Sequence, residues 1–63
     1  MLLALDIGNT NVTLGLVHGE AIIASRRAAT RATSTPDELE LLIDGLLHLD
    51  GASFSDVTGI SVA

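Results

Sequence analysis

The chain has 63 residues, of which 48% are hydrophobic, and a formal net charge of −5 with three arginines and no lysine. This composition argues against nucleic acid and anionic membranes as partners, because both attract clustered positive charge. The sequence contains no cysteine, and its first apolar run is too short for a signal peptide or a membrane span. We therefore expect a cytoplasmic protein that binds neither nucleic acid nor membrane. A domain of this size buries only ~60% of its unfolded surface and is marginal by itself.

Three strands are predicted in the first half of the chain. The first, Leu2–Asp6, is apolar at every position before the aspartate, which is typical of a central strand buried on both faces. The second, Val12–Val17, shows the period-two alternation of a strand. The third, Ala21–Ala28, follows the turn His18-Gly19-Glu20, so the second and third strands should form an antiparallel hairpin. Residues 29–34 are small and polar and predict a loop.

A helix follows this loop. Thr35 is a typical N-cap, Pro36 suits the first helical position, and Glu38 completes a capping box. Gly51, after Asp50, is a typical stop signal at the C-terminal end. The residues that recur with the helical period predict one apolar face, made of Leu39, Leu42, Ile43, Leu46 and Leu47.

A fourth strand is predicted at Val57–Ala63, which completes an α/β fold with a mixed sheet and one helix. The pattern of this strand ends without a turn or a cap, so we expect the chain to be a piece of a longer protein. Gly45 lies inside the helix, where glycine costs up to ~1 kcal/mol relative to alanine. Close packing of the helix against the sheet would explain a glycine at this position.

The most informative segment is the turn after the first strand, where residues 6–10 read Asp-Ile-Gly-Asn-Thr. Gly8 is expected to adopt a positive φ and to let the backbone approach a ligand. Backbone N–H groups in such a turn form an anion-binding concavity. Short polar side chains add further donors at Asn9, Thr10, Asn11 and Thr13. A carboxylate repels phosphate, so Asp6 is predicted to hold Mg²⁺, directly or through water.

Other polar residues carry weaker signals. Asp and Asn also cap turns through their own side chains, so a purely structural turn at residues 6–10 stays open. The two histidines, His18 and His48, lack metal-ligand spacing. A solvated strand end and loop is the favoured interpretation of Arg26, Arg27 and Arg31. The hydroxyls of the loop are expected to cap and shape it: Thr30, Thr33, Ser34 and Thr35.

The segment Leu3–Asn11 resembles the first phosphate motif of the actin-like ATPase superfamily, which includes sugar kinases, acetate kinases and heat-shock chaperones. Together with residues 33–39 and 54–57, it is similar to the N-terminus of type III pantothenate kinases. The resemblance covers the whole chain. It implies that residues 1–63 form the N-terminal part of the first actin-like ATPase domain, a truncated half-domain of the ribonuclease H-like fold.

This resemblance also implies an activity, the ATP-dependent phosphorylation of pantothenate to 4'-phosphopantothenate in coenzyme A biosynthesis. Asp6 would orient Mg²⁺, and a monovalent cation (K⁺ or NH₄⁺) and a homodimer are implied as well. The catalytic base, the pantothenate site and the cation site would lie beyond position 63, so no catalytic residue is assigned and the isolated chain is expected to be inactive. The ATP phosphate loop would comprise Asp6, Ile7, Gly8, Asn9, Thr10, Asn11, Val12 and Thr13.

Three alternatives remain open. The first is a small-molecule kinase of the same superfamily with another acceptor, although sugar kinases commonly carry Gly-Gly or Gly-Thr where Asn9 stands. The second is a non-catalytic regulator that keeps the nucleotide-binding fold. The third is a structural half-domain without a ligand. An acidic base in the sequence after residue 63 would separate the kinases from the regulator.

Overall fold

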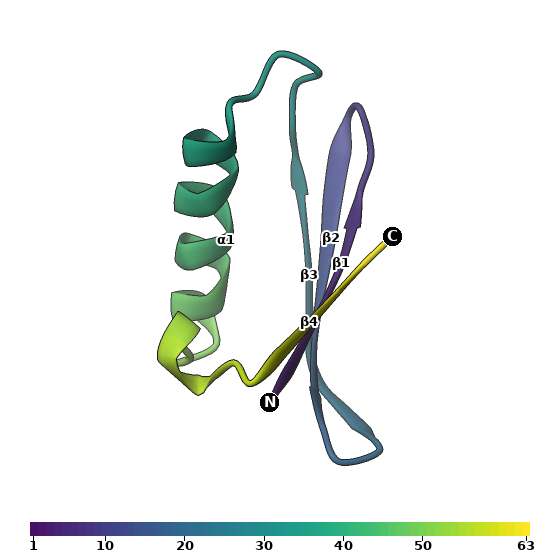
Figure 1. Ribbon diagram of the computed structural model, residues 1–63, viewed down its shortest axis with the longest axis vertical. Helices are drawn as coiled ribbons and strands as arrows, with labels where there is room; N and C mark the ends of the chain where they lie inside the picture. Colours follow the sequence, from purple (N-terminus) through teal and green to yellow (C-terminus); the bar gives the residue numbers. More distant parts are fainter.

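The computed structural model describes all 63 residues, which form a four-stranded sheet with one α-helix beside it (Figure 1). The strands are β1 (Leu2–Ile7), β2 (Asn11–His18), β3 (Ala21–Ala29) and β4 (Gly59–Val62); the helix is α1 (Pro36–Leu49), and a short 3₁₀ helix, η1, spans Phe54–Asp56. The spatial order is β3-β2-β1-β4, with β1 antiparallel to β2 and parallel to β4. The predicted element order and mixed sheet are confirmed, and they are consistent with the N-terminal half of an actin-like ATPase fold.

The hydrophobic core lies between α1 and one face of the sheet. Successive side chains on a strand point to opposite faces, so alternate residues of β1 and β2 turn toward the helix. The apolar face predicted for the helix is confirmed. Of its five residues, Leu39 and Leu42 are half-buried, and Ile43, Leu46 and Leu47 are buried. The buried residues are Leu3, Leu5, Val12, Leu14, Leu16, Ile43, Leu46, Leu47 and Ala52.

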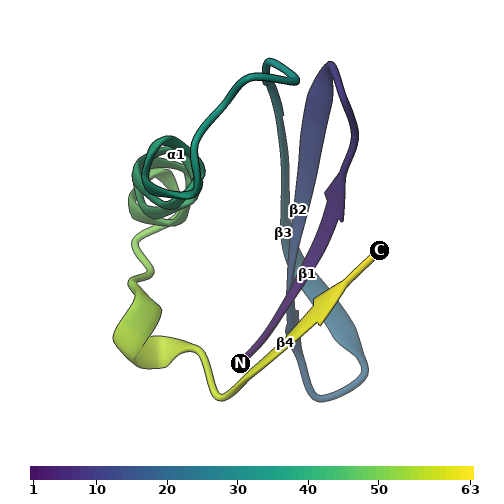
Figure 2. The same cartoon turned by 45° about the horizontal axis from the view of Figure 1, so that its top comes forward.

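The other side of the sheet is uncovered, and we call it the open face (Figure 2). Its residues include Ala4, Asp6, Thr13, Gly15, Val17 and Ser25. Strand β1 is central in the sheet, as predicted. The expectation that it is buried on both faces is wrong for this chain, because Leu2 is 40% exposed and Asp6 is exposed. The single helix shields only one face of a sheet.

A β-bulge changes the register between β2 and β3. Val17 pairs with Ile22, whereas Leu16 pairs with Ala24, so Ile23 is the extra residue. From the bulge onward, Arg26 lies opposite the buried Leu14 and therefore points to the helix side of the sheet. Its neighbour Arg27 lies opposite Thr13 and therefore points to the open face.

Both ends of α1 are capped as predicted. The Glu38 backbone N–H donates to the Thr35 hydroxyl (3.2 Å), and the Thr35 N–H donates to the Glu38 carboxylate (2.9 Å). At the other end Gly51 has φ 71° and donates its N–H to the His48 carbonyl, while the Ala52 N–H reaches the Leu47 carbonyl. This pair of bonds is a Schellman motif, which needs the left-handed conformation that glycine adopts without strain.

Two expectations about the second half of the chain are wrong. Gly45 is exposed, and a Cβ at this position would meet nothing within 4 Å, so close packing against the sheet does not explain it. The fourth strand begins at Gly59 rather than Val57, because its pairing with β1 starts with Leu2 opposite Gly59, although Val57 is extended. Before this strand, in η1, the Asp56 carboxylate accepts the Ser53 N–H (2.9 Å), which favours a tight turn. The single helix α1 is too short and too polar to cross a membrane.

Candidate functional site

The predicted phosphate turn connects β1 to β2 at one end of the molecule. Strands β1, β3 and β4 all finish at this end, and α1 begins there (Figure 1). In open α/β sheets, ligands bind outside the carboxyl ends of the parallel strands. The turn therefore lies where the architecture favours a ligand.

Three hydrogen bonds shape the turn. The Gly8 N–H donates to the Asn11 carbonyl (2.8 Å) and closes it. The first residue after β3, Thr30, donates its N–H to the Thr10 carbonyl (2.8 Å) and its hydroxyl to the Gly8 carbonyl (3.3 Å). The backbone N–H groups of Asn9 and Thr10 donate to no acceptor in the chain. Two adjacent amides at the tip are thus available to an anion.

The expected positive φ at Gly8 is wrong. Only Gly19 and Gly51 have positive φ in this chain, and no residue of the turn does. A Cβ at Gly8 would lie 3.4 Å from the Asn11 carbonyl oxygen, an ordinary contact. The four-residue turn closes through hydrogen bonds with conventional backbone angles, so the backbone itself does not require a glycine here.

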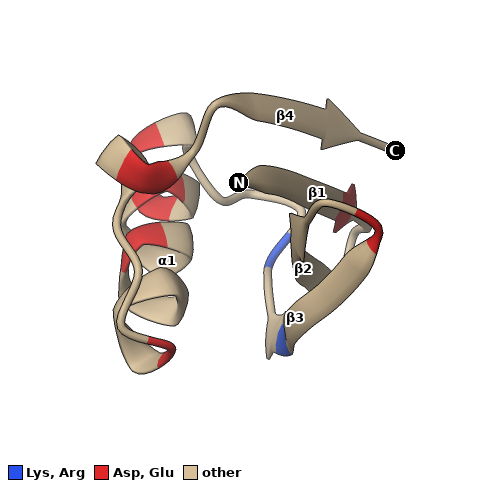
Figure 3. Ribbon diagram, turned by 90° about the horizontal axis from the view of Figure 1, so that it is seen from below, with Lys and Arg blue, Asp and Glu red and all other residues tan.

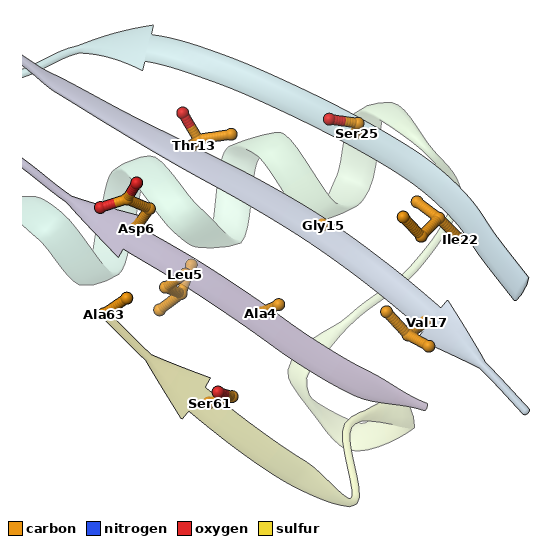
Figure 4. Close-up of a pocket in the computed structure, with 10 residues that line it drawn as sticks. All are labelled: Ala4, Leu5, Asp6, Thr13, Gly15, Val17, Ile22, Ser25, Ser61 and Ala63. Carbon is orange, nitrogen blue, oxygen red and sulfur yellow. The ribbon is translucent and has the colours of Figure 1, made fainter. Parts of the chain in front are cut away.

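Asp6 and Thr13 lie opposite each other on β1 and β2 and face the same open pocket of about 330 Å³ (Figure 4). That volume is at the lower end of the range for small-molecule sites. The Asn11 side-chain amide donates to the Thr10 hydroxyl (3.0 Å), which ties two of the predicted donors to each other. The polar side chains predicted from the sequence are thus gathered along the turn and the adjoining edge of the open face.

Two residues of the predicted loop turn away from this face. Ile7 pairs with Val12, and the Val12 side chain is fully buried in the core beside α1. The Val12 side chain fastens β2 to the core directly after the turn, whereas the Ile7 side chain is 39% exposed. The Ile7 N–H donates to the Ala63 carbonyl (3.2 Å), so this backbone group is not free for a ligand.

A metal ion at this site would depend on Asp6. The chain holds no group of three or more histidine, cysteine, aspartate or glutamate side chains that could enclose a metal. A lone exposed carboxylate fits Mg²⁺, which keeps several waters and is commonly held by one or two carboxylates together with substrate phosphates. The donor chemistry therefore suits water-mediated Mg²⁺ rather than a metal bound by protein alone.

Sequence reasoning underestimated two residues. Arg27 shares the open face with Thr13 and Asp6 in one row across three strands, whereas Arg26 is held in an ion pair with Asp50 on the other side. Figure 3 shows acidic residues along the helix and at a few positions of the sheet and its turns, while basic residues lie on β3 and in the coil after it. Thr30, expected only to shape its own loop, contacts the phosphate turn directly. Counting alternate residues along β3 would have placed Arg27 on the open face only if the bulge were already known.

Comparison with known proteins identifies the family. The family model described as "Type III pantothenate kinase" matches residues 2–63. Among relatives with that name, the one from Geotalea uraniireducens is 38% identical over 63 residues, covering 100% of this chain and 25% of the relative.

Two further type III pantothenate kinases show similar likeness. The relative from Bifidobacterium longum subsp. infantis is 44% identical over 62 residues, covering 98% of the chain and 24% of the relative. The relative from Rhizorhabdus wittichii is 44% identical over 63 residues, covering 100% of the chain and 24% of the relative. The chain spans about a quarter of the length of these relatives. Because the family model matches all but the first residue, the chain belongs to the type III pantothenate kinase family.

Proposed function

We propose that this chain supplies the first ATP-phosphate loop of a type III pantothenate kinase, which phosphorylates pantothenate to 4'-phosphopantothenate in coenzyme A biosynthesis. The observation that carries the proposal is the turn at residues 8–11. It offers the free N–H groups of Asn9 and Thr10 at the carboxyl ends of the strands, directly after Asp6. Family membership supplies the reaction.

Each residue of the loop has a distinct role in this proposal. The N–H groups of Asn9 and Thr10, with the side chains of Asn11 and Thr13, bind the β- and γ-phosphate oxygens. Asp6 orients Mg²⁺ through its water shell. When bound, the metal neutralises charge on the transferring phosphoryl group. Phosphoryl transfer depends mainly on positioning and charge neutralisation, and a rigid turn of amide donors provides the first of these.

The rest of the reaction needs groups that these 63 residues do not provide. We place the general base, the pantothenate pocket and a K⁺ or NH₄⁺ site in the remainder of the protein, through family resemblance alone. The homodimer and the cytoplasmic location belong to the same part of the proposal. The chain by itself is accordingly expected to be inactive, as one half-domain of the first actin-like ATPase domain.

Substitution of Asp6 tests the proposal in the full-length protein. Asp6→Asn keeps the size and the hydrogen-bonding capacity but removes the charge that attracts Mg²⁺. ATP turnover with pantothenate should fall by orders of magnitude while the melting temperature stays within a few degrees of the unsubstituted protein. The measurement is steady-state turnover across a Mg²⁺ titration, with a melting curve for each variant.

Asp44→Asn is a matched control, because it removes the same charge from the helix, where the Asp44 carboxylate lies 3.5 Å from His48 Nδ1 and the closer contact of that ring, at 2.7 Å, is with the Asp44 backbone carbonyl, which the substitution keeps. Its turnover should match that of the unsubstituted protein. Near-normal turnover of Asp6→Asn at ordinary Mg²⁺ would contradict the metal role. Turnover of ATP with another hydroxyl acceptor, but not with pantothenate, would contradict the proposed substrate.

A further inference from the structure

Thr30 joins the end of β3 to the phosphate turn across a sequence separation of 22 residues. Its hydroxyl donates to the Gly8 carbonyl at 3.3 Å, and its backbone N–H donates to the Thr10 carbonyl at 2.8 Å. Two other hydroxyls of this segment serve local structure. Ser34 accepts the Arg31 N–H, and Thr35 caps α1.

The two carbonyls held by Thr30 control the direction of the amides beyond them. A peptide unit is planar and trans, so its C=O and N–H point in opposite directions. The Gly8 carbonyl shares a peptide plane with the Asn9 N–H, and the Thr10 carbonyl shares one with the Asn11 N–H. Anchoring each carbonyl toward β3 therefore turns the linked amide away from β3.

The same contacts remove an electrostatic obstacle. A carbonyl oxygen that faced a bound phosphate would repel it, and a turn without fixed peptide planes would present carbonyls and amides alternately. Thr30 occupies the Gly8 and Thr10 carbonyl oxygens and leaves the Asn9 and Thr10 N–H groups free. Donors that are fixed before the anion arrives cost less to reorganise when it binds.

We propose that Thr30 is a positioning residue, whose hydroxyl fixes the Gly8–Asn9 peptide plane so that the Asn9 N–H points away from β3 and toward a bound phosphate. The phosphate part rests on the proposed function. The effect of Thr30 on the conformation of the turn does not depend on the proposed function. The conformation of the turn and the binding of phosphate can therefore be measured separately.

The test compares variants of the full-length protein. Thr30→Val removes the hydroxyl but keeps the β-branched shape and the backbone N–H bond to Thr10. The KM for ATP should rise by about two- to tenfold, the range for loss of one hydrogen bond, with a smaller change in kcat and no change in the KM for pantothenate. Thr30→Ser restores the hydroxyl and should restore the KM. Thr33→Val makes the same chemical change at an exposed position of the loop and should have no effect.

A second measurement follows the turn without relying on activity. Hydrogen exchange of a peptide covering residues 6–13 should be faster in Thr30→Val than in the unsubstituted protein or in Thr33→Val. If the unsubstituted protein does not phosphorylate pantothenate, the proposed function fails, while this exchange and the affinity for a non-hydrolysable ATP analogue still test Thr30.

Unchanged exchange or an unchanged KM for ATP in Thr30→Val would overturn the positioning role. So would an equal effect of Thr33→Val, or failure of Thr30→Ser to restore the KM. If Thr30→Val and Thr30→Ala both fail to fold, the role is also overturned, because the hydroxyl then serves the fold rather than the turn.

Discussion

Asp50 links two elements through one side chain. It follows the last residue of α1, and its carboxylate accepts two hydrogen bonds from Arg26 on β3, from Nε (3.1 Å) and from a terminal guanidinium nitrogen (2.9 Å). The hydrogen bond from Arg26 lowers the pKa of Asp50, and the charge of Arg26 adds to this against the opposing effect of desolvation. At the other end of α1, the hydrogen bonds from Thr35 lower the pKa of Glu38.

These two shifts predict how stability depends on pH. A carboxyl group whose pKa is lower in the folded state stabilises the fold above its unfolded pKa and loses this contribution as the pH falls through its folded pKa. For Asp50 and Glu38 the loss should therefore begin near pH 4 to 4.5, roughly the unfolded values, and continue below them. In the full-length protein, urea unfolding between pH 6 and pH 3 should show a shallower acid decline for Asp50→Asn and Glu38→Gln. Curves parallel to that of the unsubstituted protein would contradict the assignment.

The predicted phosphate turn shows how far single residues can be predicted. The position of the motif and the shared face of Asp6 and Thr13 follow from strand periodicity, because alternate residues of paired strands meet. The conformation of Gly8 was predicted wrongly, since a four-residue turn can close with ordinary backbone angles and composition does not say which way it does so. The contact of Thr30 with the turn depends on tertiary structure, which loop composition does not encode.

At the scale of elements, local chemistry made α1 easy to predict and β3 difficult. The caps of α1 lie within a few residues of its ends and have distinct side-chain chemistry. In β3, an uninterrupted count from the His18–Ala21 pair would place Arg26 opposite Thr13, on the open face. The bulge at Ile23 reverses this, so Arg26 lies on the helix side and Arg27 on the open face. Because the sequence of β3 does not alternate clearly between apolar and polar residues, it does not indicate the position of the extra residue.

Gly45 offers a test of the helix as an element. Because a Cβ there would meet nothing within 4 Å, Gly45→Ala should gain helix propensity without a clash. The free energy of unfolding should increase by about 0.5–1 kcal/mol. Gly51→Ala is the control, since its φ of 71° is strained for alanine although the space is free, and it should destabilise the protein. Denaturant unfolding measures both. A destabilised Gly45→Ala would show that something in the full-length protein packs on this side of α1.

For the molecule as a whole, only 9 of 63 residues are buried, and large apolar side chains remain uncovered. Ile22, Ile60 and Val62 are 74%, 60% and 61% exposed, and β3 and β4 both present unpaired edges. Exposed edges and apolar surface promote association. We therefore expect the 63-residue chain alone to self-associate or to be partly unfolded. Sedimentation should show a mass that rises with concentration, and the thermal transition should be broad. A monomer with a sharp, cooperative transition would contradict this.

The parallel pairing of β1 with β4 also predicts the order in which the strands fold. Leu2 pairs with Gly59 and Leu5 with Val62, so this contact joins the two ends of the chain, whereas β2 and β3 are joined by the tight turn at Gly19 and Glu20. Closing a long loop loses more chain entropy than closing a short one, and non-local pairing slows folding. Strands β1 to β3 should gain amide protection first, and β4 should follow once α1 has formed. Pulse-labelled hydrogen exchange during refolding of the full-length protein measures this order, and protection of β4 before β2 would reverse it.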